Sequence, residues 1–239
     1  MINHPVMGAE RKSVRSISKR WLCSLVENSA PSQFVAQRVP SGATVLPNPF
    51  DDEIFYPPKV EARSYDAVFL GRLVPFKGVD ILLKAVAIWR QSRPDVRVAI
   101  IGDGPQLERL QQLNSDLGVT ENLSFLGELT GDALAQVLRS SKSLVAPSRG
   151  EEAFGITVIE GLACACYVVT SGRGGLREAG GDTALHFSAD DSRQLAEALE
   201  AACNRYGEQG PNIAGLDGVA KYRKHAVARE FLTTLEGMV

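Results

Sequence analysis

The sequence predicts an α/β protein in which helices cover both faces of a parallel β-sheet. Short apolar runs alternate along the chain with longer stretches whose apolar residues recur at helical spacing, which is the order of elements in βαβ units. The short runs are mainly apolar, as expected for strands buried on both faces. Two of them end in the glycine-containing turns at Gly71 and Gly102, where a strand can turn towards a helix.

The strands of the sheet are expected at residues 65–70, 96–101, 123–126, 143–147, 167–170 and 184–187, each an apolar or β-branched run. The helices between them are expected at residues 79–92, 106–117, 132–139, 155–162 and 192–206. The first helix follows from the spacing of its apolar residues, Ile81, Leu82, Ala85, Val86 and Trp89.

Both ends of the chain contain further predicted elements. Residues 22–27 are expected to form a short strand and residues 32–39 a short helix. Residues 207–218 are rich in Gly, Asn and Asp, which predicts a loop. One or two closing helices are expected after it, within residues 219–238.

The composition is that of an ordinary globular protein with enough apolar material for a large core: 239 residues, 44% hydrophobic and 23% charged. A net charge of −2 argues against general nucleic-acid binding. No apolar run approaches the length of a membrane span, and no signal-peptide pattern is visible at the start. The cysteines, which lack metal-ligand spacing, are expected to be small buried thiols in a reducing cytoplasm; they are Cys23, Cys164, Cys166 and Cys203.

Residues 10–21 are basic and have some helical character. Their apolar side is thin, consisting of Val14, Ile17 and Trp21, so a solvated helix face is favoured over a patch for anionic lipids.

The stretch from Ser148 to Glu160 predicts a ligand site. A buried strand, a polar loop and a helix N-terminus follow one another here, and the unpaired N–H groups of a first helical turn bind anions. Two carboxylates, Glu152 and Glu160, lie in the same stretch. Carboxylates beside an anion site suit sugar or ribose hydroxyls, so a ligand with both phosphate and hydroxyl groups is predicted. A nucleotide-sugar has both.

Two cations follow the first strand of the sheet. Arg72 lies directly after it, and Lys77 lies in the loop that Gly78 closes. Ligands of open α/β sheets bind at the carboxyl ends of strands, and a guanidinium fork and an ammonium together suit a diphosphate.

These residues resemble the retaining glycosyltransferase family 4, which has the GT-B fold. Glu152 and Glu160, separated by seven residues with Phe154 and Gly155 between them, resemble its central signature. Further resemblances, in family order, are Pro47-Asn48-Pro49-Phe50-Asp51, Gly71-Arg72-Leu73 with Lys77-Gly78, Ile101-Gly102-Asp103-Gly104-Pro105, and Gly174-Gly175 with Glu178. Three positions depart from the family's usual residues, namely Phe76, Ala165 and Tyr167.

The resemblance implies a role for each site residue. Arg72 and Lys77 would bind the diphosphate, Glu152 the transferred sugar and Glu160 the ribose; Arg72, Lys77 and Glu152 are the expected catalytic residues. The expected donor-binding residues are Gly71, Arg72, Lys77, Gly127, Leu129, Glu152, Phe154, Gly155, Ile156, Thr157 and Glu160. The donor would be a UDP-, GDP- or ADP-sugar and the acceptor a hydroxyl of a glycan or lipid-linked saccharide, as in polysaccharide biosynthesis. No metal or cofactor is expected.

The resemblance also divides the chain. Residues 1–43 would be a remnant of the acceptor-side N-terminal domain, residues 44–218 the nucleotide-sugar-binding Rossmann-like domain (the C-terminal domain of a GT-B fold), and residues 219–239 a closing helix. Because most of the first domain is not expected in this chain, the apolar side chains in residues 22–39 should be exposed, favouring self-association or a partner. They are Leu22, Leu25, Val26, Phe34 and Val35.

The predicted function is therefore the donor-binding half of a hexosyl-transferring, retaining glycosyltransferase in the cytoplasm or at the inner face of the membrane. The alternative is a non-catalytic nucleotide-sugar-binding module, or one half of a split enzyme that needs a partner chain. A nicotinamide-dependent oxidoreductase is disfavoured, because Leu107 occupies the third glycine position of the dinucleotide fingerprint.

Overall fold

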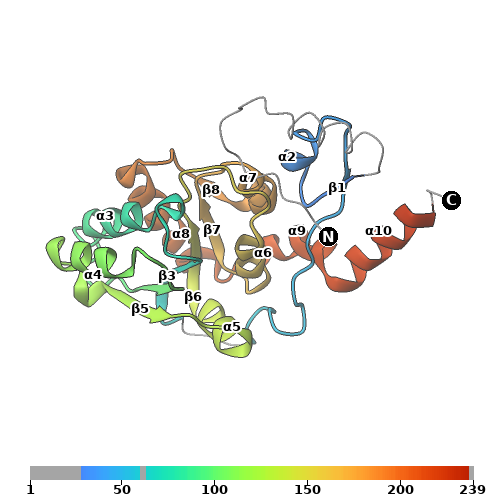
Figure 1. The fold of residues 1–239 in the computed structure, drawn as a ribbon. Helices are drawn as coiled ribbons and strands as arrows, with labels where there is room; N and C mark the ends of the chain where they lie inside the picture. The colour runs from blue at the N-terminus through green and yellow to red at the C-terminus, as the bar shows by residue number, and fades with distance from the viewer. Residues whose placement is uncertain (1–27, 60–62, 237–239) are drawn as a thin grey trace, which may run out of the picture.

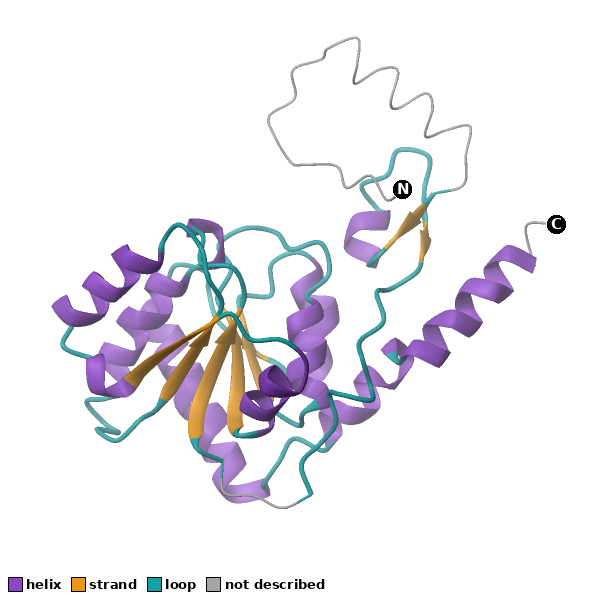
Figure 2. Ribbon diagram, turned by 60° about the horizontal axis from the view of Figure 1, so that its bottom comes forward, coloured by secondary structure: helices purple, strands orange, loops and turns teal. Residues whose placement is uncertain are grey.

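The computed structural model describes residues 28–59 and 63–236. Its centre is a parallel six-stranded sheet with the order β5-β4-β3-β6-β7-β8, and helices cover both faces (Figures 1 and 2). This confirms the predicted Rossmann-like α/β fold. The predicted strand at residues 22–27 and the basic segment at residues 10–21 lie outside the described residues.

The six strands lie where the apolar runs predicted them, within two residues at most ends. Their bounds are β3 Tyr65–Leu70, β4 Val98–Ile101, β5 Leu123–Gly127, β6 Ser141–Ala146, β7 Tyr167–Thr170 and β8 Leu185–His186. Every neighbouring pair is parallel, so all of the strands end at the same edge.

The helices form two layers, one on each side of the sheet. Their bounds are α3 Val79–Trp89, α4 Leu107–Asp116, α5 Gly131–Arg139, α6 Ile156–Ala163, α7 Gly175–Gly180, α8 Ser192–Gln209, α9 Ala214–Val219 and α10 Lys224–Glu236, with short 3₁₀ turns η1 Pro75–Lys77, η2 Thr120–Asn122, η3 Gly181–Thr183 and η4 Ala220–Tyr222.

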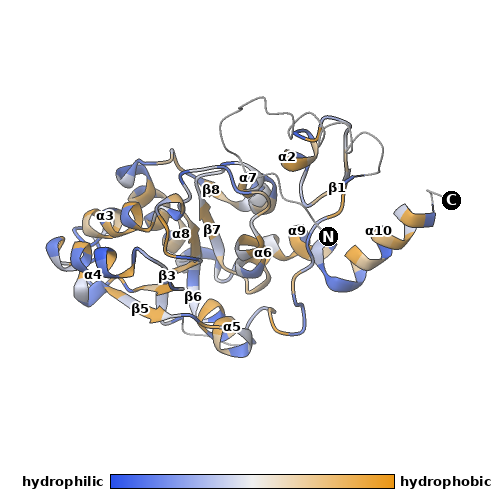
Figure 3. Ribbon diagram, in the orientation of Figure 1, coloured by the Kyte–Doolittle hydropathy of each residue, from blue (hydrophilic) through white to orange (hydrophobic). Residues whose placement is uncertain are grey.

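Alternate residues of each strand face different cores. Phe69 and Ile100 pack with residues of α3, α4 and α8, whereas Val68 and Ile101 pack with residues of α5, α6, α7 and α9. The central strands and α6 are therefore mainly hydrophobic, while the peripheral α4 is mainly hydrophilic (Figure 3). Burial on both faces explains why these strands appear in the sequence as continuous apolar runs.

The segment predicted as a loop, residues 207–218, is largely helical, which corrects that prediction. Helix α8 continues to Gln209, and α9 begins at Ala214. Gly215 is buried, and a Cβ there would lie 2.9 Å from Leu162 Cδ2 on α6. The glycine thus allows close packing of α9 on α6. The Gly215 N–H donates to Asn212 Oδ1 at 3.1 Å.

Residues 29–45 form a small separate unit beside α7. Strand β1 (Ser29–Ala30) pairs in parallel with β2 (Thr44–Val45), and α2 (Gln33–Ala36) lies between them in sequence and packs against α7. The side chains of Phe34 and Val35 are half-buried, and the Arg38 guanidinium lies 3.5 Å from the Phe34 ring centroid. These two residues are therefore only partly exposed, whereas the expectation was full exposure. Leu22, Leu25 and Val26 lie outside the described residues.

The predicted C-terminal segment contains helix α10, which extends away from the sheet (Figure 1). The turn before α10 contacts the segment that follows residues 29–45. The Phe50 N–H in that segment donates to the Tyr222 carbonyl at 3.1 Å. The domain boundaries at 43/44 and 218/219 stay predictions, and the pairing of β1 with β2 spans the first of them.

The cysteines within the described residues, Cys164, Cys166 and Cys203, are buried free thiols. Ala165, where the family usually has glycine, adopts a left-handed conformation with φ 56°. The buried Arg63 guanidinium donates to the carbonyls of Cys164 and Ala165 at 3.1 and 3.2 Å. The turn between α6 and β7 is thereby held despite its alanine.

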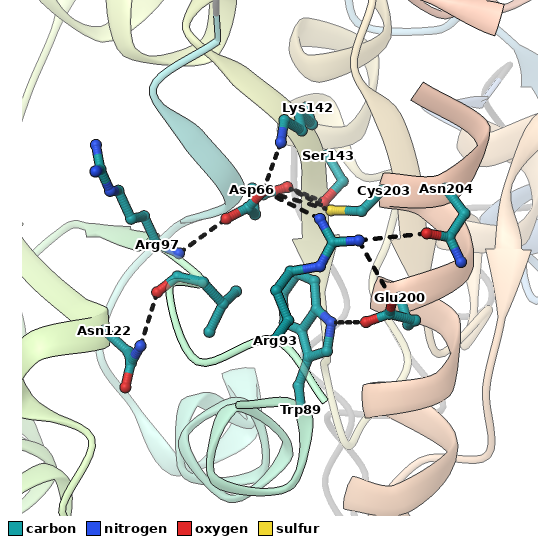
Figure 4. A network of polar contacts seen from close by, with 11 residues as sticks. Asp66, Trp89, Arg93, Arg97, Asn122, Lys142, Ser143, Glu200, Cys203 and Asn204 are labelled. Carbon is teal, nitrogen blue, oxygen red and sulfur yellow. Dashed lines mark hydrogen bonds and ion pairs between the residues drawn. The ribbon is translucent and has the colours of Figure 1, made fainter. Parts of the chain in front are cut away.

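A polar network closes the amino-terminal end of the central strands (Figure 4). The Asp66 carboxylate, at the start of β3, accepts from the Arg97 N–H at 2.9 Å and from Lys142 Nζ at 2.7 Å. Arg93 lies 3.9 Å from the same carboxylate, and the Cys203 thiol of α8 lies 3.8 Å from it. Burial raises the pKa of that thiol to about 12, so it stays protonated.

Candidate functional site

The candidate site lies where the chain order of the strands reverses, between β3 and β6. In open α/β sheets a crevice forms at this switch point, outside the carboxyl ends of the strands, because the connections on either side leave to opposite faces. A hollow of about 150 Å³ lies there, bordered by Leu70 of β3, Ala146 of β6 and the start of α6. A second hollow of about 490 Å³ continues over β4 and β5 and shares Leu70 with the first.

Gly71, which lies directly after β3, lines the larger hollow. A Cβ on Gly102 would lie 2.0 Å from the Gly71 carbonyl oxygen, so the turns after β3 and β4 approach more closely than any side chain allows. The next residue, Arg72, projects into the larger hollow. Its side chain is exposed, and its guanidinium has no partner among residues 28–59 and 63–236.

Lys77 enters the smaller hollow from η1. The following residue, Gly78, has φ 68° and no room for a side chain, because a Cβ would lie 2.1 Å from the Pro147 carbonyl oxygen. The loop after β3 is thus packed directly on the loop after β6. This contact brings Lys77 to the residues of the other predicted motif.

The Lys77 ammonium pairs with Glu152, which sequence reasoning did not anticipate. Lys77 Nζ donates to Glu152 Oε1 at 2.6 Å, and Ser148 Oγ donates to the same oxygen at 2.6 Å. Lys77 and Glu152 are 24% and 16% exposed, so solvent screens the pair only partly. The other oxygen, Oε2, has no partner in the described part of the chain and remains free to accept from a hydroxyl.

The backbone of Glu152 is held by the turn after β7. The Gly175 N–H donates to the Glu152 carbonyl at 2.7 Å. A Cβ on Gly174 would lie 2.4 Å from that carbonyl oxygen, so both glycines of this motif serve close approach. In α7, Glu178 accepts from the Gln33 N–H at 2.9 Å, and Ser32 donates to the Ala153 carbonyl at 2.5 Å. Segment 29–45 is thus attached beside Glu152.

Helix α6 opens towards the smaller hollow with free donors. Its N-cap is Gly155 at φ 106°, which offers no side-chain cap. The N–H groups of Ile156 and Thr157 have no acceptor within the described ranges, and both residues line the hollow together with Phe154. Partly positive helix ends of this kind bind anions.

Glu160 lies one turn into α6 and has no hydrogen-bond or ion-pair partner among the described residues. Burial raises the pKa of its carboxyl to about 7. A half-buried carboxyl without a donor is unfavourable for folding, and such groups concentrate at functional sites.

The predicted residues thus fall into three groups. Lys77, Glu152, Phe154, Gly155, Ile156 and Thr157 line the smaller hollow. Gly71, Arg72 and Leu129 border the larger one.

Gly127 and Glu160 line neither hollow; Gly127 supports the turns through its carbonyl, which accepts from the Gly102 N–H at 2.7 Å. Sequence reasoning gave no role to Ser148 or Arg149. The available signal was their position directly after a buried strand.

The described residues show neither a metal cluster nor a membrane-spanning helix. They contain no group of three or more His, Cys, Asp or Glu side chains arranged to hold a metal ion. None of their helices has the length and apolar character needed to cross a bilayer.

Two relatives and one solved structure of the same fold illustrate the similarity to known proteins. The GDP-mannose-dependent alpha-(1-6)-phosphatidylinositol monomannoside mannosyltransferase of Mycolicibacterium smegmatis is 34% identical over 65% of this chain and 45% of its own. A D-inositol 3-phosphate glycosyltransferase of Stackebrandtia nassauensis is 31% identical over 81% of this chain and 48% of its own. The crystal structure of Anabaena HepE with UDP and glucose has a TM-score of 0.77 at 20% identity, covering 92% of this chain and 66% of that one.

The chain spans about half the length of the curated relatives it matches. Residues 51–209 match the family described as glycosyl transferases group 1. This range contains Arg72, Lys77, Glu152 and Glu160, together with all six strands of the central sheet. The chain belongs to the glycosyl transferases group 1 family.

Proposed function

We propose that this chain binds the diphosphate of a nucleotide-sugar at the junction of β3 and β6 and serves as the donor-binding part of a retaining family 4 glycosyltransferase. One observation carries the proposal. Lys77, from the loop after β3, and the free N–H groups of Ile156 and Thr157, at the start of α6, border one hollow. A cation and a helix N-terminus that border the same hollow suit a diphosphate.

The donor assignment rests on the chemistry of the hollows and on the relatives. The larger hollow, beside Arg72 and Leu129, would take the nucleoside. One relative is named for its dependence on GDP-mannose, and one structural neighbour is titled with UDP and glucose. A UDP-, GDP- or ADP-sugar is the proposed class, and a hydroxyl of a glycan or lipid-linked saccharide is the proposed acceptor.

Each charged residue has a separate proposed role. Arg72 and Lys77 bind the diphosphate, and Glu152 accepts from hydroxyls of the transferred sugar through its free oxygen. Glu160 accepts from the ribose. Because Lys77 Nζ lies 2.6 Å from Glu152 Oε1, the diphosphate competes with that carboxylate for the ammonium. Glu152 keeps the Ser148 hydrogen bond in either state.

In the proposed reaction the bond between the anomeric carbon and the diphosphate oxygen breaks. The acceptor oxygen bonds to the same carbon on the same face, and its proton passes to the departing diphosphate. The N–H groups of α6 are fixed at the helix N-terminus, and Arg72 and Lys77 add two cations, to stabilise the charge that develops on the leaving group. Donors fixed in advance stabilise that charge without reorganising during the reaction.

Titration calorimetry of this chain with UDP, GDP and ADP tests the donor site. We expect weak binding of at least one nucleoside diphosphate and little sugar transfer by this chain in isolation. Lys77→Ala should raise the Kd by roughly ten- to a hundredfold, whereas Lys84→Ala, which removes an exposed cation from the middle of α3, should not. Absence of heat with all three ligands at millimolar concentration would refute the site.

Retention is tested separately on protein that transfers sugar, by proton NMR of the first product formed. The anomeric configuration of the product should equal that of the donor. An inverted product would contradict the family 4 assignment while leaving the donor site intact. Binding without transfer under any condition, with an added partner chain included, would favour the non-catalytic binding module.

A further inference from the structure

The loop that carries Lys77 has little internal support. The turn η1 has three residues, and Val74, at its N-cap, makes no side-chain capping bond. Pro75 and Phe76 are exposed. A lysine side chain is long and flexible, so the position of its ammonium depends on what holds the backbone of this loop.

Arg149, from the loop after β6, binds the two carbonyls that directly precede Lys77. Its N–H donates to the Phe76 carbonyl at 2.8 Å, and its guanidinium donates to the Pro75 carbonyl at 3.0 Å. The neighbouring Gly150 packs under the Phe76 ring, because a Cβ there would lie 2.1 Å from Phe76 Cε2. The loop of Lys77 is therefore fastened to the loop that carries Glu152.

The same guanidinium is fixed on its other sides by two carboxylates. Its two terminal nitrogens lie 2.6 and 2.7 Å from the two oxygens of Asp80, in the first turn of α3. Its Nε lies 2.6 Å from Asp190, in the loop before α8. Hydrogen bonds to these carboxylates raise the pKa of Arg149. Burial alone would raise the pKa of Asp80, but the hydrogen bonds from Arg149 and the nearby positive charges together outweigh burial, so the pKa of Asp80 is lowered.

Asp190 has an unusual backbone. Its φ is 70°, one of two positive values among non-glycine residues of the described chain. Asp tolerates this region better than most residues, but it remains unfavourable without compensating contacts. The ion pair with Arg149 is such a contact. Three loops at the carboxyl edge of the sheet thus meet at one guanidinium.

We propose that Arg149 is a positioning residue: together with Asp80 and Asp190 it fixes the loop before Lys77, so that the Lys77 ammonium is presented to the donor diphosphate. This role rests on the proposed function. Arg149 is not proposed to touch the ligand, since its fork is directed at Asp80. Lysine cannot replace it, because one ammonium cannot bind a carboxylate with two parallel bonds while also reaching Asp190 and the Pro75 carbonyl.

The test compares Arg149→Lys, Lys77→Ala and the double variant in titrations with the nucleoside diphosphate that wild type binds and with its parent nucleoside. Arg149→Lys should raise the diphosphate Kd about five- to twentyfold, with the nucleoside Kd within about twofold of wild type. The double variant should bind the diphosphate no worse than Lys77→Ala alone, because Arg149 acts through Lys77. Arg90→Lys is the matched control, since Arg90 lies at the end of α3 that is remote from the site, and it should change neither Kd.

Asp190→Asn is the second variant, chosen because Asp190 is 58% exposed and Asn tolerates the same positive φ, so the variant should fold. It should raise the diphosphate Kd two- to threefold. The proposal is overturned if both Arg149→Lys and Asp190→Asn bind the diphosphate like wild type. It is also overturned if the increase in Kd of the double variant equals the product of the increases in the two single variants, Arg149→Lys and Lys77→Ala. Failure of wild type to bind any nucleoside diphosphate would instead refute the proposed function, and the positioning role with it.

Discussion

The two ends of the central strands differ in how completely their polar groups are paired. At the amino end, the Asp66 carboxylate is bound by Lys142, the Arg97 N–H and Arg93. At the carboxyl end, the N–H groups of Ile156 and Thr157 have no partner among the described residues.

The difference follows from what each end can gain. A buried carboxylate surrounded by donors is stable, but it offers nothing to a ligand, whereas unpaired donors cost stability unless a ligand satisfies them. The amino end therefore serves folding. The carboxyl end keeps donors and acceptors free for a diphosphate and hydroxyls.

The largest expected effect tests the amino end. Asp66→Ala should lower the free energy of unfolding by about 3 kcal/mol, because Lys142 loses its partner in a partly buried site. The affinity for a nucleoside diphosphate should not change. Urea-induced unfolding measures the first quantity and titration calorimetry the second. Asp95→Ala, which removes an exposed carboxylate just before β4, should change stability by less than about 0.5 kcal/mol. Equal destabilisation by both would refute the structural role of the network.

The reverse pattern is expected at the carboxyl end. Lys77→Ala should weaken nucleoside diphosphate binding by roughly 1.5–3 kcal/mol, because it removes a charged hydrogen bond and leaves the Glu152 charge unneutralised beside the ligand. The free energy of unfolding should fall by less than about 1 kcal/mol, since Ser148 still donates to Glu152. A loss of stability as large as that of Asp66→Ala would remove the contrast between the two ends.

A smaller, pH-dependent effect is expected from Glu160. Burial raises the pKa of its carboxyl from 4.5 to about 7, so the folded protein binds this proton more tightly than the unfolded chain. The free energy of unfolding should therefore fall as pH rises from about 4.5 to 7. Glu160→Gln should remove this loss and be more stable than wild type by about 1–2 kcal/mol at pH 8, but not at pH 4.5. Urea titrations at both pH values measure the difference, and an equal effect at both would contradict it.

The strands and the site motifs were predictable because each is encoded locally. Tyr65–Leu70 and Tyr167–Thr170 match the prediction at both ends, since both are short, mainly apolar segments that end before Gly71 and Ser171. The motif residues Arg72, Lys77 and Glu152 follow strand ends, and parallel strands bring their carboxyl ends together.

The remaining features depend on contacts between distant segments. Helix α9 was missed because Gly215 indicates a loop until Leu162 is known to pack against it. The pairing of Lys77 with Glu152 joins positions separated by 75 residues, and no local pattern encodes it. Arg149 acts through three loops that meet only in the folded sheet.

The central claim is that Lys77 binds the diphosphate and Glu152 the sugar, and Glu152→Gln tests it most directly. Dissociation constants are measured for the bare nucleoside diphosphate and for the matching nucleotide-sugar, chosen from UDP-glucose, GDP-mannose and ADP-glucose. Glu152→Gln should leave the bare diphosphate unchanged or bind it more tightly, because a carboxylate no longer competes for Lys77, while weakening the nucleotide-sugar by about 1–3 kcal/mol. If Glu152→Gln weakens the bare diphosphate as much as Lys77→Ala does, the assignment of the two residues is wrong.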